Sequence, residues 1–405
     1  MYRFRLFLIV ILIFQVCHSQ NFSLNKGETK AKDYYTEITF EYIKSKIIIP
    51  VIIEGKTYRF ILDTGAPNII SENLFRTIQN DSLSTIPITD INQKKKQLKV
   101  VAIPKLILGD VTFENSAALV YDINQNKIFE CFKIDGFIGS NLLRNSIIQI
   151  QLENKLIKLT DNKKRLILKK KNALKMKLLG IQSNPFIWIN FKGTNTAKEQ
   201  VLIDTGMDGF YNMSNKNFKV FENKNLIKII DSSSGGSSVG LFGLDKKSNQ
   251  YRFLLPKIKI SNITFNNFIT KSTNDKYSKI GTEILDYGDI IIDYINKRFY
   301  LDSFHEEINL KKKMLGFNPT LIDNKVVVGF VWSEELKKRI SFGDEIIEVN
   351  GLKLSDIDLC NFLVIDNTFR EMEKFNLIIK TQNGETIELN IEKKYFPNSL
   401  YLQKL

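Results

Sequence analysis

Residues 60–65 read FILDTG, and residues 201–206 read VLIDTG. In both stretches an Asp-Thr-Gly tripeptide ends a run of apolar residues. At average composition a given tripeptide is expected about 0.05 times by chance in a chain of this length. Two copies in the same context therefore indicate an internal duplication. The duplication places one carboxylate on an equivalent element of each half, namely Asp63 and Asp204.

The similarity between the two halves continues downstream of both tripeptides. The offset is 141 residues between Thr64 and Thr205, and it is one residue more at the end of the repeat. The first half contains IPKLIL at 103–108, FIGSNLL at 137–143 and NKLIKL at 154–159, and the second contains LPKIKI at 255–260, IGTEIL at 280–285 and NKRFYL at 296–301. Each copy has the size of a common domain, so the chain contains two related lobes.

Most of residues 35–302 is typical of short strands. Residues 47–53 are rich in β-branched side chains, and a turn at 54–56 leads into a second strand at 58–62 that delivers Asp63. Residues 186–191 and 200–203 form the corresponding hairpin before Asp204, and a short helix is expected at 72–78. Frequent strands with few helices predict a mainly β fold with two β-barrel lobes.

Two irregular stretches lie between these strands. Residues 231–243 read DSSSGGSSVGLFG, which indicates either a flap or active-site loop or the ordinary tip of a long hairpin. The corresponding stretch of the first half, residues 88–101, contains no glycine. The Lys-rich segment 161–177 is expected to join the lobes at the surface.

The composition is basic, with 58 Lys and Arg against 44 Asp and Glu and a formal net charge of +14. Lysine runs lie at 94–96, 169–171 and 311–313, and they are interpreted as solvated faces. Binding of acidic surfaces or nucleic acid is the alternative. No recognisable nucleic-acid module accompanies the runs, so no nucleic-acid partner is predicted.

The N-terminus is typical of an export signal. Arg3 and Arg5 precede an apolar stretch at 6–16 that is too short for a membrane span, and cleavage is expected after Ser19. We therefore expect residues 1–19 to direct the protein to the periplasm, the cell surface or the medium. Cys17 leaves open a lipid-anchored form. No later stretch is long and apolar enough for a membrane helix.

Several kinds of chemistry are excluded by the residues that are missing. After signal cleavage His305 is the one remaining histidine, and a Ser-His-Asp or Cys-His site would have to use it from a polar connector. Cys131 and Cys360 fall in different predicted domains, so we expect no disulfide and interpret each as a small buried side chain. No metal site and no cofactor are predicted, and carboxylate chemistry remains.

These motifs resemble the retropepsin-like aspartic proteases of clan AA. The resemblance rests on the aliphatic residues before Asp-Thr-Gly and on the apolar-apolar-Gly segment at 137–139, and both are repeated in the second half. Retroviral members assemble their site from two identical chains, and pepsin-like members use two lobes of one chain. This chain resembles the second arrangement, with lobe 1 at 20–162 and lobe 2 at 163–303. A monomer with an intramolecular pseudo-dimer is expected.

The resemblance implies a catalytic pair, Asp63 and Asp204. Two carboxyls at close range share one proton, so the ionised one activates a water and the protonated one serves the substrate carbonyl. The threonines would hydrogen-bond across the pair, and the glycines would allow tight turns where a Cβ would clash. The supporting residues are Thr64, Gly65, Thr205 and Gly206.

The sequence departs from the family pattern near both aspartates. Ala66 lacks the hydroxyl that pepsin-like enzymes have at this position, which predicts a milder pH optimum than that of strongly acidic pepsins. In the second lobe Met207 and Asp208 differ from the pattern, and Lys279 replaces an apolar residue before Ile280. No flap tyrosine is recognisable.

Residues 311–395 resemble a PDZ domain. The stretch SFGDEIIEVNG at 341–351 is a specific match, and Met314 with Leu315, Gly316 and Phe317 resembles the carboxylate-binding loop. The resemblance implies that this loop binds a peptide C-terminus while the peptide adds as a strand. The alternative is a module that only packs against the lobes. Secreted bacterial aspartic proteases with a C-terminal PDZ domain have this architecture.

Two functions from different classes follow. The first is a secreted aspartic endopeptidase that acts on protein or peptide substrates, with a PDZ domain that binds peptide C-termini or regulates access. The second is a catalytically inactive peptide-binding or scaffold protein that acts through its PDZ domain. The presence of both Asp63 and Asp204 favours the first.

Overall fold

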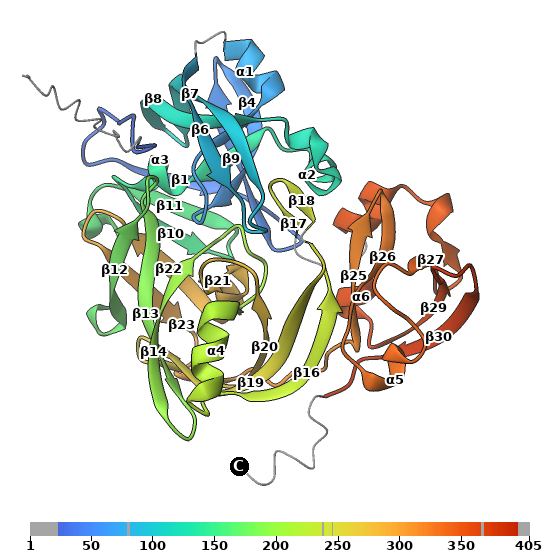
Figure 1. The fold of residues 1–405 in the computed structure, drawn as a ribbon. Coiled ribbons are helices and arrows are strands. Elements are labelled where there is room, and N and C mark those ends of the chain that lie inside the picture. Colours follow the sequence, from blue (N-terminus) through green and yellow to red (C-terminus); the bar gives the residue numbers. More distant parts are fainter. Residues whose placement is uncertain (1–22, 79–81, 237–238, 245, 366–367, 396–405) are drawn as a thin grey trace, which may run out of the picture.

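The structure is a computed structural model that describes residues 23–78, 82–236, 239–244, 246–365 and 368–395 (Figure 1). The chain is mainly β with barrel-like sheets, which confirms the predicted fold class. The predicted signal peptide, 1–19, lies outside the described residues. Among the helices of the described part, none has the length and apolarity needed to cross a membrane.

Lobe 1 is built on an eight-stranded sheet in which β3 also pairs with β7, so that the sheet closes on itself. The predicted hairpin is β3 and β4, and the predicted helix is α1 (Glu72–Ile78). Strand β4 runs parallel to β9, which places Asp63 opposite Gly139. The strands in sheet order are β2 (Glu41–Ile43), β3 (Lys46–Ile53), β4 (Lys56–Asp63), β9 (Gly136–Gly139), β5 (Ile69–Ser71), β8 (Val111–Tyr121), β7 (Lys95–Leu108) and β6 (Ser82–Thr89).

Lobe 2 repeats this topology. Strand β14 runs parallel to β21, with Ile203 opposite Ile280, and β15 pairs with both β21 and β20 as β5 pairs with β9 and β8. Helix α4 (Asn215–Asn223) follows β15 as α1 follows β5. The strands are β13 (Asn184–Lys192), β14 (Thr196–Ile203), β15 (Tyr211–Ser214), β16 (Lys228–Gly235), β19 (Ser248–Ile260), β20 (Ile263–Thr273) and β21 (Lys279–Ile280).

A run of six strands from both halves joins the lobes. Its order is β1 (Tyr35–Thr39), β11 (Leu156–Thr160), β10 (Ile147–Gln151), β22 (Gly288–Asp293), β23 (Arg298–Ser303) and β12 (Ala173–Leu179). The junction is the antiparallel pair β10 and β22, where Ile148 faces Ile292. One hydrophobic cluster continues through both lobes and includes Leu62 and Ile203. Strand β12 begins at Ala173, so the segment 161–177, which was predicted to be a surface connector, extends into this strand.

Short elements complete the two lobes. The N-terminal segment belongs to the body of the molecule, because Leu24 is fully buried and its amide donates to the carbonyl of Ile181 at 2.9 Å. The remaining elements are η1 (Ile123–Gln125), α2 (Lys127–Phe132), α3 (Ser140–Leu143), η2 (Lys163–Arg165), η3 (Lys170–Asn172), β17 (Val239–Gly240), β18 (Gly243–Leu244), η4 (Thr282–Tyr287) and β24 (Glu307–Asn309).

The C-terminal part forms a separate six-stranded sheet with its own hydrophobic cluster, centred on Phe317, Val328 and Leu377. Strand β25 is at one edge of this sheet. The elements are β25 (Phe317–Ile322), β26 (Lys325–Val331), α5 (Glu334–Lys337), β27 (Glu345–Val349), β28 (Leu352–Lys353), η5 (Leu354–Asp356), η6 (Asn361–Ile365), α6 (Thr368–Glu371), β29 (Lys374–Lys380) and β30 (Thr386–Glu392).

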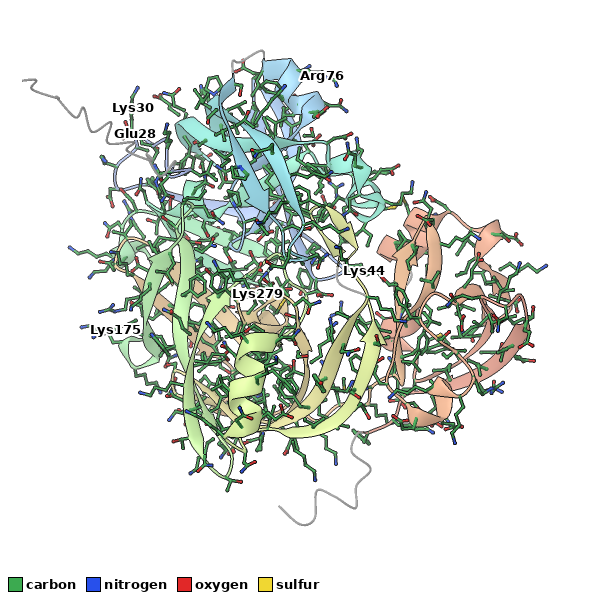
Figure 2. All side chains as sticks on the ribbon, viewed as in Figure 1. Glu28, Lys30, Lys44, Arg76, Lys175 and Lys279 are labelled. Carbon is green, nitrogen blue, oxygen red and sulfur yellow. A yellow bond between two sulfur atoms is a disulfide. The ribbon has the colours of Figure 1, made fainter. Side chains whose placement is uncertain are left out.

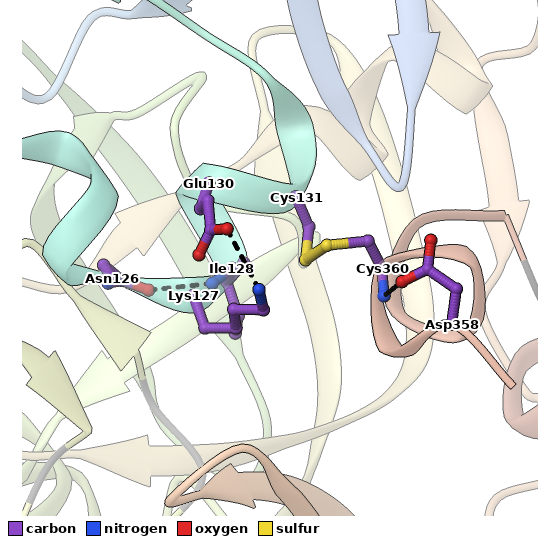
Figure 3. The surroundings of a disulfide bond; sticks show 7 residues. All are labelled: Asn126, Lys127, Ile128, Glu130, Cys131, Asp358 and Cys360. Carbon is purple, nitrogen blue, oxygen red and sulfur yellow. Dashed lines mark hydrogen bonds and ion pairs between the residues drawn. A yellow bond between two sulfur atoms is a disulfide. The ribbon is translucent and has the colours of Figure 1, made fainter. Parts of the chain in front are cut away.

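A disulfide joins Cys131 at the end of α2 to Cys360 just before η6, with the two Cα atoms 4.9 Å apart (Figure 3). The expectation of no disulfide was therefore wrong. It assumed that cysteines in different predicted domains lie far apart. The C-terminal sheet instead packs against the lobes, and Cys131 with Cys360 links lobe 1 to it across 229 residues of chain.

Candidate active site

The two Asp-Thr-Gly loops meet where the lobes join, and their threonines bond to each other reciprocally. The amide of Thr64 donates to Oγ1 of Thr205 at 3.0 Å, and the amide of Thr205 donates to Oγ1 of Thr64 at 3.1 Å. Each hydroxyl then donates to a carbonyl of the opposite lobe, Thr64 to Ile203 at 2.7 Å and Thr205 to Leu62 at 2.8 Å. Both threonines are buried, so these four bonds fix the loops together.

The carboxyls of Asp63 and Asp204 are held by the loops that carry them. Oδ1 of Asp63 accepts from the amide of Gly65 at 2.9 Å, and Oδ1 of Asp204 accepts from the amide of Gly206 at 3.0 Å. Bonds of this kind favour the ionised form of each carboxyl. Each carboxyl of the sequence-predicted pair thus has the same backbone donor in its own loop, and the pair is brought together because each aspartate also lies against the glycine of the other loop.

The two glycines lie directly against the opposite aspartate. A Cβ added to Gly65 would lie 2.5 Å from Cγ of Asp204, and one added to Gly206 would collide with Cγ of Asp63. Neither glycine has a positive φ. A positive-φ turn therefore does not explain why glycine occupies these positions. The expected Cβ clash does explain it, and the atoms that a Cβ would meet belong to the carboxyl of the opposite aspartate.

The apolar-apolar-Gly segments pack behind the loops. The amide of Gly139 donates to Oδ1 of Asn68 at 2.9 Å, and the amide of Gly281 donates to the carbonyl of Phe210 at 3.2 Å. Added Cβ atoms would collide with backbone carbonyls in both lobes. Close backbone approach therefore requires glycine at both positions.

Lys279 directly contacts one member of the pair, Asp204. Its Nζ lies 2.9 Å from Oδ2 of Asp204 and 2.5 Å from Oδ2 of Asp275, and it lies where the two lobes meet (Figure 2). The exposed fractions of the side chains are 9% for Lys279, 7% for Asp204 and 15% for Asp275. The sequence marked Lys279 as a departure but did not indicate its partners. The sequence signal for an ion pair was Asp275, which lies four residues before Lys279.

The surroundings separate the pKa values of the two carboxyls. Burial, followed by the negative charge of Asp204, raises the pKa of Asp63 to about 7, although Lys279 opposes this rise. Burial alone would also raise the pKa of Asp204, but the charge and hydrogen bond of Lys279 outweigh it and lower this pKa below its ordinary value. One proton therefore resides on Asp63 from acidic pH to near neutrality.

Two long hairpins, β6–β7 of lobe 1 and β16–β19 of lobe 2, touch at their ends. Oδ1 of Asp90 accepts from the amides of Asn92 and Lys94, each at 2.9 Å, and thereby closes the turn of lobe 1. Oδ2 of Asp90 accepts from the amide of Phe242 at 3.0 Å, and Nδ2 of Asn92 donates to the carbonyl of Gly243 at 2.8 Å. The described part of 231–243 is thus a hairpin end that is bonded to the other lobe.

The hairpin of lobe 2 also contacts the C-terminal sheet. The amide of Gly236 donates to the carbonyl of Gly329 at 3.2 Å, and Oγ of Ser233 accepts from the amide of Val331 at 3.1 Å. A Cβ on Gly235 would collide with the carbonyl oxygen of Gly329. The two backbones approach this closely because glycine occupies both facing positions.

The predicted carboxylate-binding loop lies at the start of β25. The carbonyl of Leu315 accepts from the guanidinium of Arg252 in lobe 2 at 3.3 Å, and the carbonyl of Gly316 accepts from the amide of Trp332 at 2.7 Å. Phe317 is fully buried, with its ring centroid 6.1 Å from that of Phe369. These bonds use carbonyl oxygens of the loop.

The described residues contain no group of three or more His, Cys, Asp or Glu side chains that is arranged to hold a metal ion. His305 lies exposed in the connector after β23. The titratable groups that contact each other at the candidate site are therefore carboxyls and one ammonium.

Comparisons with known proteins give a family match for part of the chain and structural likenesses at low identity. Residues 49–142, which contain the first Asp-Thr-Gly and the segment 137–139, match the family described as aspartyl protease. The chain is similar in structure to an aspartic proteinase from Irpex lacteus, at 11% identity over 67% of this chain and 98% of that chain, with a TM-score of 0.41. It is also similar to a retropepsin-like aspartic protease from Rickettsia conorii, at 15% identity over 33% and 94%, with a TM-score of 0.22. No curated protein matches its sequence significantly. The family match supports an aspartic protease fold.

Proposed function

We propose that this chain is an aspartic endopeptidase that hydrolyses peptide bonds in protein or peptide substrates. The observation that carries the proposal is the pair of carboxyls, Asp63 and Asp204, on loops locked together by the reciprocal bonds of Thr64 and Thr205. The match of residues 49–142 to aspartyl proteases supports it. A rigid pair with separated pKa values is suited to general acid–base chemistry.

We assign a role to each carboxyl from the directions in which the two pKa values are shifted. Ionised Asp204 takes a proton from a water held between the two side chains, and the resulting hydroxide attacks the peptide carbonyl carbon. Protonated Asp63 gives its proton to the carbonyl oxygen, so a neutral gem-diol forms. When the C–N bond breaks, Asp204 returns its proton to the leaving nitrogen and Asp63 recovers one from the diol. No covalent intermediate and no cofactor enter this sequence.

The proposal is tested with isosteric variants of both carboxyls. The purified mature protein is incubated with a mixed peptide library between about pH 4 and 7, a window that spans carboxyl pKa values at such sites. Asp63→Asn and Asp204→Asn should each lower cleavage at least about 100-fold, because each removes one proton-transfer group. Asp110→Asn, in the exposed turn between β7 and β8, is the matched control.

Loss of cleavage in only one variant would show that the two aspartates do not act as a pair. If the folded parent cleaves nothing at any pH, the second hypothesis takes its place, a peptide-binding or scaffold protein. That hypothesis draws on the edge position of β25, which suits strand addition by a peptide.

We further propose that residues 311–395 form a PDZ domain that binds peptide C-termini through Leu315, Gly316 and Phe317, or regulates access to the site. Regulation draws support from contacts with both lobes. Nη1 of Arg370 donates to Oγ of Ser45 at 3.1 Å, and the hairpin of lobe 2 bonds to β26.

A fluorescent peptide with a free apolar C-terminus tests both roles, and the same peptide with an amidated C-terminus is its control. Binding of the free form alone would support carboxylate recognition. A change in the cleavage rate of a separate substrate at saturating peptide would support regulation. Equal binding of both forms, or none, would contradict carboxylate recognition.

Export is proposed from residues 1–19, and the Cys131–Cys360 disulfide supports it because such bonds persist in oxidising compartments. N-terminal sequencing of the mature protein should begin at Gln20. Incorporation of labelled lipid at Cys17 would instead support the anchored form. Light scattering should give the mass of a monomer, since both lobes come from one chain.

A further inference from the structure

Lys279 occupies a position whose counterpart in lobe 1 is apolar. In lobe 1, β4 pairs with β9 so that Ile61 faces Phe137. In lobe 2, β14 pairs with β21 so that Leu202 faces Lys279. Phe137 is buried in an apolar cluster, with its ring 5.2 Å from that of Phe129. The same strand position therefore fills a core in one lobe and carries an ammonium in the other.

The ammonium of Lys279 is directed at one carboxyl of the pair. Burial of a lone ammonium costs several kcal/mol in general, which a close carboxylate offsets. Here the ammonium contacts two carboxylates, those of Asp275 and Asp204. Oδ1 of Asp204 already accepts from the amide of Gly206, so both oxygens of this carboxyl have a donor.

Other charged or titratable groups in the described part of the chain also border this cluster. Glu199 on β14 is bonded to Ser278, the neighbour of Lys279. Tyr294 is linked to the loop of Asp63, since its hydroxyl lies 3.0 Å from Oγ of Ser140, which donates to the carbonyl of Thr64. Nζ of Lys46 donates to the carbonyl of Gly206 at 2.5 Å.

We propose that Lys279 is a positioning residue whose ammonium, although shared with Asp275, keeps Asp204 as the ionised member of the pair and leaves the shared proton on Asp63. The inference rests on the proposed function. Lobe 2 then always supplies the general base and lobe 1 the general acid. Without the ammonium the two carboxyls would have near-symmetric backbone donors, and neither would be preferred for the proton.

The pH dependence of kcat/KM tests the assignment. A positive charge lowers the pKa of nearby carboxyls, most strongly that of the nearest one, by roughly 1–3 units. The acid limb of the parent profile should lie below the ordinary pKa range of an Asp carboxyl, and the upper limb near pH 7, where Asp63 loses its proton. Lys279→Met should move both limbs to higher pH, the acid limb by at least about one unit.

Three further variants make the result specific. Lys279→Arg keeps the charge and should keep the acid limb of the parent. Lys259→Met removes an exposed lysine of β19 and should leave the profile unchanged. Asp275→Asn removes the carboxylate that competes for the ammonium, so both limbs should move to lower pH, the opposite direction to Lys279→Met.

Loss of folding in Lys279→Met is handled by a double variant. Lys279→Met with Asp275→Asn removes the ammonium without leaving the partly buried Asp275 as a second unpaired carboxylate, and its acid limb should also move to higher pH. An unchanged profile with a uniformly lower kcat would reduce Lys279 to a structural role. Faster cleavage at every pH would show that Lys279 inhibits. Either result overturns the proposal.

The failure of the proposed function can be distinguished from the failure of this inference. If the parent cleaves nothing, the pKa values of Asp63 and Asp204 are measured by ¹³C NMR of their carboxyl carbons. Titration of Asp204 at lower pH than Asp63, with a rise in Lys279→Met, would uphold the inference for a protein of another function. Titration of Asp63 at lower pH than Asp204 would refute the inference.

Discussion

The two lobes have the same backbone contacts around their tripeptides but different side chains next to them. Thr64 and Thr205 exchange equivalent bonds, and each aspartate accepts from its own glycine amide. Outside the tripeptide, Lys279 and Phe137 share one strand position but not their chemistry. The duplicated motif thus sets the geometry of the pair, and residues outside it set the charge.

A second difference lies deeper in lobe 2. Glu199 on β14 is buried and accepts hydrogen bonds from Tyr211, Asn217 and Ser278. At the duplication offset, lobe 1 has the partly buried Tyr58 on β4, which packs against the hydrophobic core. Lobe 2 therefore has a polar interior network where lobe 1 has an apolar contact, although the strands are the same.

The largest expected effect would test the symmetric part of this comparison. Gly65→Ala and Gly206→Ala each place a Cβ against the opposite aspartate, at 2.5 Å from Asp204 in the first case. Both should lower kcat/KM at least about 100-fold, because small misplacement of reacting groups is costly. Gly209→Ala is the control, since its Cβ would meet nothing closer than 3.9 Å. Survival of activity in one glycine variant would show that the lobes contribute unequally.

The threonine pair should give the next largest effect, on stability. Thr64→Val leaves the amide of Thr205 and the carbonyl of Ile203 without their buried partners, and Thr205→Val does the same to Thr64 and Leu62. Each should lower the free energy of unfolding by about 3 kcal/mol. Denaturant unfolding of both variants and of the double variant measures this. If the loss of unfolding free energy in the double variant equals the sum of the two single losses, the bonds of Thr64 and Thr205 act independently, which would argue against coupled loops.

The disulfide ties lobe 1, and not lobe 2, covalently to the C-terminal sheet. Cys131→Ser with Cys360→Ser should lower the free energy of unfolding by about 2 kcal/mol, since a closed loop restricts the unfolded chain. Thermal unfolding of the double variant and of the reduced parent, each compared with the oxidised parent, checks this. If reduction leaves the free energy of unfolding of the parent unchanged, the noncovalent contacts alone hold the sheet in place.

The smallest effect concerns the polar network that only lobe 2 has. Burial raises the pKa of Glu199 above its ordinary 4.5. A raised folded-state pKa stabilises the fold below the unfolded pKa, and this stability is lost as pH rises through the folded value. Glu199→Gln should therefore flatten the decline in unfolding free energy above about pH 4.5. Glu222→Gln on the exposed face of α4 should keep the parent slope.

The sequence predicted what local pattern controls. The hairpin before Asp63 and the helix at Glu72–Ile78 follow from β-branched runs, turn residues and their spacing, and both are present. The pairing of the halves follows from the repeat. The Cys131–Cys360 bond and the reach of Lys279 to Asp204 depend on how distant segments pack. No periodicity within one segment reports such contacts.

Both halves lie in one chain, and the antiparallel pair β10 and β22 joins them in a common sheet. A homodimer of one half would repeat every substitution on both sides of its symmetry axis. A lysine at the position of Lys279 would then arrive twice, with an ammonium beside each aspartate. Fusion of the halves removes that constraint. In a fused chain one half can acquire a substitution that the other half lacks. A site with a fixed general base and a fixed general acid can then arise from two copies of one sequence.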